Sequence, residues 1–105
     1  MYGTLAGALA GREIPVDRTT FTATVDGRIV GPAGVGKPIR IESIRVRYAF
    51  AVAPEARDRT ERALALHPRG CPAHESVKDA IKVTWDAMVM IGSETVFYRS
   101  EELQA

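Results

Sequence analysis

The segment at residues 69–77 reads Arg-Gly-Cys-Pro-Ala-His-Glu-Ser-Val and contains the only cysteine of the chain. Pro72 suits the first position of a helix, where its missing N–H costs nothing, and Gly70 lets the chain turn into that helix. We therefore expect Cys71 at the first turn of a helix that runs to about Asp79. Unpaired backbone N–H groups and the helix dipole favour a thiolate there. The alternative is that Cys71 is a small buried residue that only packs at a helix start.

Length and composition predict one folded domain over residues 1–105. The chain is 46% hydrophobic and 26% charged, with a formal net charge of +1, which gives no general electrostatic reason to bind nucleic acid or an anionic membrane. A single cysteine argues against a disulfide-stapled secreted domain and fits a reducing cytosol. The apolar stretch from Met1 to Ala10 is too short to span a bilayer and lacks the layout of a signal peptide. We therefore predict a cytoplasmic protein.

The stretch from Met1 to Ala10 is expected to form an apolar helix. Gly3, Gly7 and Gly11 recur every four residues along it. Glycine weakens a helix by about 1 kcal/mol per residue relative to alanine. We expect close approach by another helix or a sheet to compensate, as is typical of a helix that is apolar almost all round.

Alternating residues predict three strands. The first spans residues 19–29 and the second, unusually long, spans 39–52, with a change of apolar phase near Glu42 that indicates a β-bulge. Arg40, Arg45 and Arg47 are expected on the face away from the core, as an exposed row or, less favoured, as a contact for an acidic partner. A helix from Pro54 to the break at 68–70 and the Cys71 helix precede a third strand at 81–91. A polar tail follows, in which residues 96–98 are expected to dock. The order indicates an α+β fold.

Two motifs are weaker than they look. The run at residues 31–38, Gly-Pro-Ala-Gly-Val-Gly-Lys-Pro, approaches a phosphate-binding loop, but Pro38 replaces the hydroxyl residue and a strand follows where a helix is needed. We interpret it as a hairpin loop. His67 and His74 flank Cys71, yet zinc needs about four ligands, so we predict no metal and no cofactor. His74 is expected to be a neighbour of Cys71 rather than its catalytic partner.

Taken together, these features resemble the OsmC/Ohr family of osmotically induced and organic hydroperoxide resistance proteins. The resemblance rests on Gly-Arg-Glu-Ile-Pro-Val (Gly11–Val16), Ile-Arg-Val-Arg-Tyr (Ile44–Tyr48) and above all Gly-Cys-Pro-Ala-His-Glu-Ser-Val (Gly70–Val77). It extends from Met1 to about Met90. It implies an OsmC-like fold with an apolar central helix, two long antiparallel strands, two helices and a final strand. It also implies an intertwined homodimer, joined through the Met1–Ala10 helix and the strands.

The resemblance further implies a two-cysteine cycle. In the family a peroxidatic cysteine on the central helix attacks the peroxide, and a resolving cysteine in the Cys-Pro motif closes a disulfide. Cys71 occupies the resolving position and is the predicted catalytic residue. The family's peroxidatic position falls immediately before Met1, and its N-terminal strands, activating arginine and glutamate have no counterpart in these residues. The chain thus resembles the C-terminal two-thirds of such an enzyme, either as a piece whose start lies upstream or as a short member.

Two functions from different classes follow. The first is thiol-dependent detoxification of organic hydroperoxides, with an organic hydroperoxide as substrate and a dithiol as reductant. The second is a non-catalytic dimeric scaffold or small-ligand-binding module that has lost the two-cysteine chemistry. Whether the chain is an enzyme stays open at this point, because a lone cysteine and an apolar glycine-rich helix are compatible with both.

Overall fold

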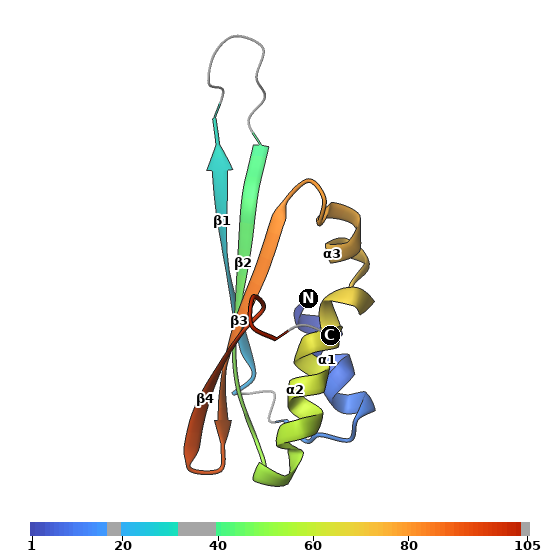
Figure 1. Cartoon of the computed structure of the whole chain (residues 1–105), viewed down its shortest axis with the longest axis vertical. Coiled ribbons are helices and arrows are strands. Elements are labelled where there is room, and N and C mark those ends of the chain that lie inside the picture. Colours follow the sequence, from blue (N-terminus) through green and yellow to red (C-terminus); the bar gives the residue numbers. More distant parts are fainter. Residues whose placement is uncertain (17–19, 32–39, 104–105) are drawn as a thin grey trace.

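The structure is a computed structural model that describes residues 1–16, 20–31 and 40–103 (Figure 1). Its elements in chain order are α1 (Tyr2–Gly11), β1 (Thr22–Val30), β2 (Arg40–Val52), the 3₁₀ turn η1 (Pro54–Ala56), α2 (Arg57–Leu66), the 3₁₀ turn η2 (His67–Gly70), α3 (Pro72–Val77), β3 (Lys82–Ile91) and β4 (Glu94–Arg99). The α+β class predicted from the sequence is confirmed. None of the helices in these described ranges is long and apolar enough to cross a membrane.

The four strands form one mixed sheet in the order β1-β2-β3-β4. β1 pairs with β2 and β3 with β4 in antiparallel fashion, whereas β2 and β3 run parallel because the helices connect them. Arg28 lies opposite Ser43 but Ile29 lies opposite Ile41, so the pairing skips Glu42. The β-bulge predicted at this point is confirmed. It explains the change of apolar phase along β2, since one extra residue turns every later side chain to the other face.

The helices cover one face of the sheet, and the core lies between these two layers (Figure 1). Leu5 and Leu9 of α1 and Leu64 of α2 are fully or almost fully buried against it. The strands contribute alternate residues, and those of β2 and β3 are buried in two matching rows: Val46, Tyr48, Phe50 and Val52, and Trp85, Ala87, Val89 and Ile91. Arg45 and Arg47 alternate with them and lie on the opposite face, as predicted.

The sequence interpretation missed the fourth strand. Residues 94–99 do not form a docked polar tail but an antiparallel hairpin with β3, in which Tyr98 is buried. Gly92 makes the turn with φ +62, a conformation that glycine adopts without strain. The strand at 81–91 is therefore not the last one. The Cys71 helix is also shorter than expected, because α3 ends at Val77.

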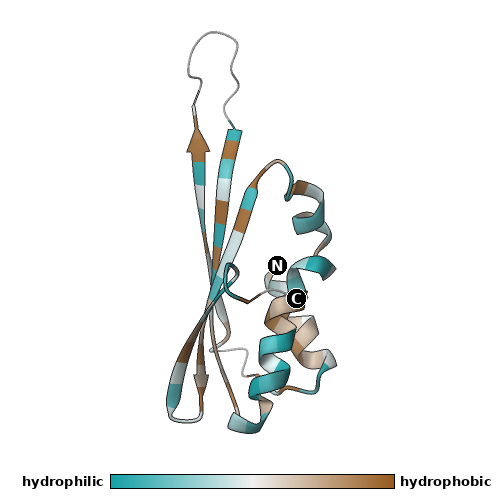
Figure 2. Cartoon of the chain, in the orientation of Figure 1, coloured by the Kyte–Doolittle hydropathy of each residue, from teal (hydrophilic) through white to brown (hydrophobic). Residues whose placement is uncertain are grey.

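β1 and β2 extend beyond the helical layer as a two-stranded arm (Figure 1). Apolar side chains that face the helix side remain uncovered there, with Val25 64%, Ile29 67% and Ile41 43% exposed. Figure 2 shows hydrophobic segments between hydrophilic ones along the arm. The predicted hairpin loop, apart from Gly31, and Ile39 lie outside the described residues.

Candidate functional site

Cys71 lies between η2 and α3 as the N-cap residue of α3, one step before the helical turn in which we expected it. Its backbone N–H donates to the carbonyl of Pro68 (3.2 Å), and its carbonyl accepts from the N–H of Glu75 (3.0 Å). Pro72 follows as the first helical residue, in agreement with the sequence argument. These bonds hold the backbone of Cys71 on both sides, and the residue is 4% exposed and lies near Thr4 of α1.

The Cys71 thiol has hydrogen-bond donors on two sides. Burial raises its pKa, but the backbone N–H of His74, the hydroxyl of Thr4 and the amino group of Met1 lie near Sγ and lower the pKa, and the net effect is a lowered pKa. Thr4 also lies close to Gly70, because a β-carbon built there would be in van der Waals contact with the Thr4 methyl group at 3.4 Å. The direction of this pKa shift is the one that a helix start was expected to give, although Thr4 carried no signal in the motif.

A buried pair of polar rings, Tyr48 and His67, lies behind this thiol. Nδ1 of His67 is 2.7 Å from the carbonyl oxygen of Leu64, so it carries the proton and donates it. Nε2 then accepts from the hydroxyl of Tyr48 at 3.1 Å. Trp85 contacts the imidazole edge-on, with ring centres 5.3 Å apart. The sequence placed both residues on inward faces but gave no indication that they pair.

The electrostatics of this pair keep both rings neutral. Burial lowers the pKa of His67 to about 4, so the imidazole is uncharged at pH 7. Burial and, to a smaller extent, negative charge at Cys71 raise the pKa of Tyr48 above its ordinary value. Tyr48 thus lies close to Cys71. The surroundings of Cys71 are therefore largely apolar. The nearby polar groups of Tyr48 and His67 bind each other and not the thiol.

His74 contacts Cys71 through its backbone and not through its imidazole. Its Nδ1 is buried without a hydrogen-bond partner in the described part of the chain, and the nearest acid, Glu75, places Oε1 3.7 Å away. This arrangement agrees with a neighbouring role and not with a Cys-His catalytic pair. Over residues 1–16, 20–31 and 40–103, no group of three or more His, Cys, Asp or Glu side chains is arranged to hold a metal ion.

The outer surface of α1 is open. A β-carbon at Gly3, Gly7 or Gly11 would meet no neighbouring atom of the described chain within 4 Å, so the described residues do not provide the close packing expected along the glycine stripe. A groove of about 550 Å³ runs beside it, lined by α1 and by residues that follow it, including Ile14 and Phe21. Leu9 lies at the base of this groove and is almost fully buried, whereas Leu5 is not part of its lining and packs in the core.

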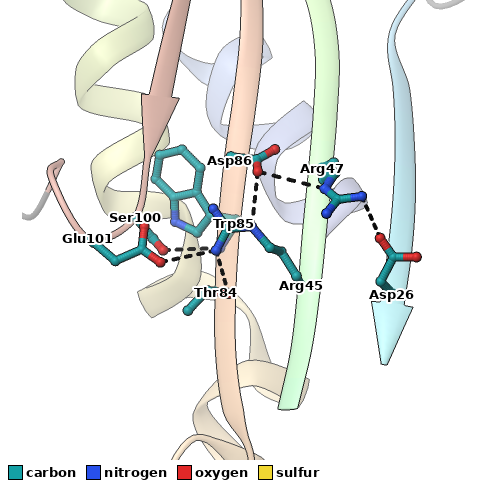
Figure 3. A network of polar contacts seen from close by, with 8 residues as sticks. All are labelled: Asp26, Arg45, Arg47, Thr84, Trp85, Asp86, Ser100 and Glu101. Atoms are coloured by element: carbon teal, nitrogen blue, oxygen red, sulfur yellow. Dashed lines mark hydrogen bonds and ion pairs between the residues drawn. The ribbon is translucent and has the colours of Figure 1, made fainter. Parts of the chain in front are cut away.

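The arginines of β2 are occupied by neighbouring acids (Figure 3). Arg45 donates to Asp86 (3.0 Å), to Thr84 (3.0 Å) and to Glu101 (3.1 Å). Arg47 donates to Asp26 (2.7 Å) and lies 3.8 Å from Asp86. These contacts connect β1, β2, β3 and the segment after β4. The arginine row is therefore part of a charge network within the sheet, which favours the exposed-face interpretation over a site for an acidic partner.

No protein-family model matches the sequence, and no curated protein matches it either. Among solved structures, an OsmC-like protein from Mycoplasma pneumoniae is similar, with a TM-score of 0.65 and 15% sequence identity. The alignment covers 83% of this chain and 62% of that protein, so the chain spans less than two thirds of its length. The OsmC-like fold predicted from the sequence motifs is confirmed by this likeness, which at such low identity concerns the fold alone.

Proposed function

We propose that this chain is an OsmC-like thiol protein of organic hydroperoxide detoxification, in which Cys71 acts as the resolving thiol. The observation that carries the proposal is the position of the buried Cys71 thiol beside the Thr4 hydroxyl and the His74 backbone N–H, two groups that lower its pKa. A thiol that only packs needs no such donors. The thiolate is the nucleophilic form of cysteine, so this environment prepares Cys71 for thiol–disulfide chemistry.

The 105 residues contain one cysteine, so the second sulfur of the cycle comes from outside them. The second thiolate attacks the terminal peroxide oxygen, which breaks the O–O bond, forms a sulfenic acid and releases the alcohol after protonation. The Cys71 thiolate then attacks the sulfenic sulfur, forms the S–S bond and expels hydroxide. A dithiol reductant finally exchanges twice with this disulfide, leaves as its own disulfide and restores both protein sulfurs. The cytosol predicted above would keep such a dithiol reduced.

Burial favours the resolving step over direct attack on a peroxide. Cys71 is only 4% exposed and lies under α1, so a free hydroperoxide has little access to Sγ. A sulfenic acid held at α1 would need to come within bonding distance of Sγ, and Thr4 of the same helix lies near this sulfur. The geometry therefore fits a partner sulfur that is delivered by, or next to, α1.

The experiment uses the full chain with cumene hydroperoxide, a small monothiol as the second sulfur and dihydrolipoamide as the reductant. We expect peroxide consumption above that of Cys71→Ser, and a mixed disulfide at Cys71 in the intact mass. Thr4→Val should raise the pKa of Cys71 and slow disulfide formation near neutral pH. Thr60→Val is the matched control, because its buried hydroxyl has no partner in the described chain. Equal rates for the wild type and Cys71→Ser would refute the proposal.

The second candidate is a dimeric scaffold without chemistry, and the open glycine face of α1 favours it. Gly3, Gly7 and Gly11 leave room for close approach of another helix, and the adjoining groove is lined mainly by apolar residues. We propose that a second copy packs there and against the strands, which would offset the low helix propensity of glycine. Sedimentation should show a dimer at micromolar concentration, and Gly7→Leu should weaken it. A dimer in which Cys71→Ser changes no rate would favour the scaffold, whereas a monomer would exclude the proposed assembly.

A further inference from the structure

The outer face of the sheet carries three exposed apolar side chains that the reaction proposed above does not use. Met88, Met90 and Phe97 are 38%, 50% and 69% exposed. The two methionines belong to β3, and Phe97 lies directly opposite Met88 on β4. A methionine thioether is a common target of oxidation, which converts it into a polar sulfoxide. The two exposed thioethers are therefore candidates for modification.

Met88 lines a hollow of the outer face that does not include Met90. The hollow has a volume of about 350 Å³ and lies over parts of all four strands. Ala49, directly opposite Met88 on β2, also lines it, and its small side chain leaves room beside the thioether. A small hydroperoxide that occupies the hollow is therefore placed next to Met88 and not next to Met90.

Arg99 is the hydrogen-bond donor that the hollow offers to such a molecule. It lies on β4 opposite Asp86, diagonal to Met88 across the two strands, and lines the same hollow. Diagonal neighbours on one face of a sheet are within reach of long side chains. In the described part of the chain the Arg99 guanidinium makes no hydrogen bond or ion pair, whereas Arg47, the other arginine of the lining, donates to Asp26 at 2.7 Å.

The acids near Arg99 are bonded to a different arginine. Arg45 donates to Asp86 at 3.0 Å and to Glu101 at 3.1 Å. Asp86 is the residue opposite Arg99 in the sheet, and Glu101 follows it by two residues in the chain. Because both carboxylates already accept from Arg45, the guanidinium of Arg99 is available to a molecule in the hollow.

The reaction of a thioether with a hydroperoxide needs such a donor. The sulfur lone pair attacks the terminal peroxide oxygen, so that the S–O bond forms while the O–O bond breaks. Its electron pair stays on the leaving oxygen, which takes up the proton of the transferred hydroxyl group and departs as the alcohol. Sulfur is thereby oxidised by two electrons and the peroxide is reduced. A hydrogen-bond donor beside the leaving oxygen stabilises the negative charge that develops on it.

We propose that Met88 is an oxidation site for small hydroperoxides, at which Arg99 stabilises the leaving oxygen and then donates to the sulfoxide that forms. The modification places a polar acceptor beside Phe97, in an apolar part of the outer face, and thiol-dependent sulfoxide reductases can reverse it. The proposal is independent of the resolving role of Cys71, since no cysteine takes part in this reaction.

The experiment treats the full chain with excess tert-butyl hydroperoxide in the Cys71→Ser background, so that the result does not depend on the thiol. Fragment-ion mass spectrometry of the peptide that contains both methionines follows each sulfoxide with time. We expect Met88 to react about threefold faster than Met90, although Met90 is the more exposed of the two. Exposure alone predicts the opposite order. Absence of sulfoxide at Met88, or a rate no greater than that of Met90, would overturn the proposal.

Two charge variants test the role of Arg99. Arg99→Gln should slow oxidation of Met88 about threefold and leave Met90 unchanged, because only Met88 shares the hollow with this side chain. Lys82→Gln is the matched control, since it removes a positive charge of β3 that lies outside the hollow, and both rates should stay the same. Arg99 and Lys82 are both exposed, so neither change removes a core side chain, and circular dichroism checks the fold. An unaltered Met88 rate in Arg99→Gln, or an equal decrease in Lys82→Gln, would contradict the proposed assistance by Arg99.

Discussion

The two faces of the sheet are formed by alternating residues of the same strands, yet they are stabilised in different ways. On the helix side, Val89 and Ile91 of β3 are at most 5% exposed. On the outer side, Met88 and Met90 of the same strand are 38% and 50% exposed. Burial of apolar surface contributes roughly 25 cal/mol per Å², so the helix side supplies most of the folding free energy. The residues of each strand thus alternate in the same way toward both faces. The faces differ because helices cover only one of them.

The outer face also divides into two halves. One half carries the ion pairs of Arg45 and Arg47 (Figure 3), and the other exposes Met88, Met90 and Phe97, the last 69% exposed. Exposed ion pairs contribute little net free energy, because water solvates the separated charges almost as well. The outer face therefore depends on the helix side for its stability. Four changes, taken from the largest expected effect to the smallest, test this asymmetry.

Truncation of neighbouring residues on β3 compares the two faces most directly. Ile91→Ala leaves a cavity under the helices and should lower the free energy of unfolding by about 2–5 kcal/mol. Met90→Ala removes a side chain that is 50% exposed and should change it by roughly 0.5 kcal/mol or less. Urea unfolding followed by Trp85 fluorescence measures both. Similar losses for the two variants would mean that the outer face is covered in solution.

Acid should destabilise the helix side through His67. Its pKa is about 4 in the folded chain against an ordinary 6.5, so the unfolded chain binds more protons between these values. The contribution of neutral His67 is full above pH 6.5 and is lost as the pH falls toward 4. The loss amounts to roughly 3 kcal/mol over that interval.

His67→Gln is the control for this acid effect. It removes the titrating group while leaving an amide to bond Tyr48. The free energy of unfolding of the variant should therefore change less between pH 6.5 and 4. Lys78 lowers the pKa of Glu75, and hydrogen bonds from the backbone and from Arg45 lower the pKa of Glu101. Protonation of these two carboxylates also destabilises the fold in acid. It occurs at lower pH, however, and equally in the wild type and in the variant. Parallel pH profiles for the two proteins would show that His67 is not buried as described.

These tests also concern features that the sequence predicted and features that it could not predict. Alternation predicted which residues of β2 and β3 face the core, and the phase change at Glu42 predicted the bulge, because both depend only on neighbouring residues. β4 was missed because its short run, Val96-Phe97-Tyr98, shows no clear alternation and is held by pairing with β3. Its formation depends on a partner strand, which local patterns do not encode.

The site shows the same limit. Gly70 and Pro72, which mark the turn and the helix start, predicted the position of Cys71 to within one residue, since turn chemistry is local. Thr4 and Tyr48 reach the same region from elements that are distant in sequence, and nothing in their own surroundings marks them. The open glycine face of α1 shows the converse, because the sequence predicted that something packs there and the described chain supplies no such partner.

The Tyr48 hydroxyl tests how much a single buried polar contact contributes to the helix side. Tyr48→Phe leaves Nε2 of His67 buried without a donor, which should lower the free energy of unfolding by about 1–3 kcal/mol. Tyr98→Phe is the matched control, because its hydroxyl donates at 2.9 Å to Glu61, whose carboxylate is 32% exposed and accessible to water. We expect a smaller loss there. Equal losses in thermal unfolding would indicate that water reaches His67.

The smallest effect is expected for the ion pairs of the outer face, and here two pairs can be compared. Arg47 and Asp26 are 55% and 62% exposed, whereas Arg45 and Asp86 are 29% and 30% exposed. A double-mutant cycle with Arg47→Gln and Asp26→Asn should give a coupling of about 0.2–1 kcal/mol that falls further in high salt, because both charges are well solvated. The Arg45–Asp86 cycle should give a larger and less salt-sensitive coupling, since these groups are half as exposed and Arg45 also binds Thr84 and Glu101. If the exposed pair instead shows the larger coupling, something covers that end of the outer face, and the difference between the two faces of the sheet is smaller than the single chain implies.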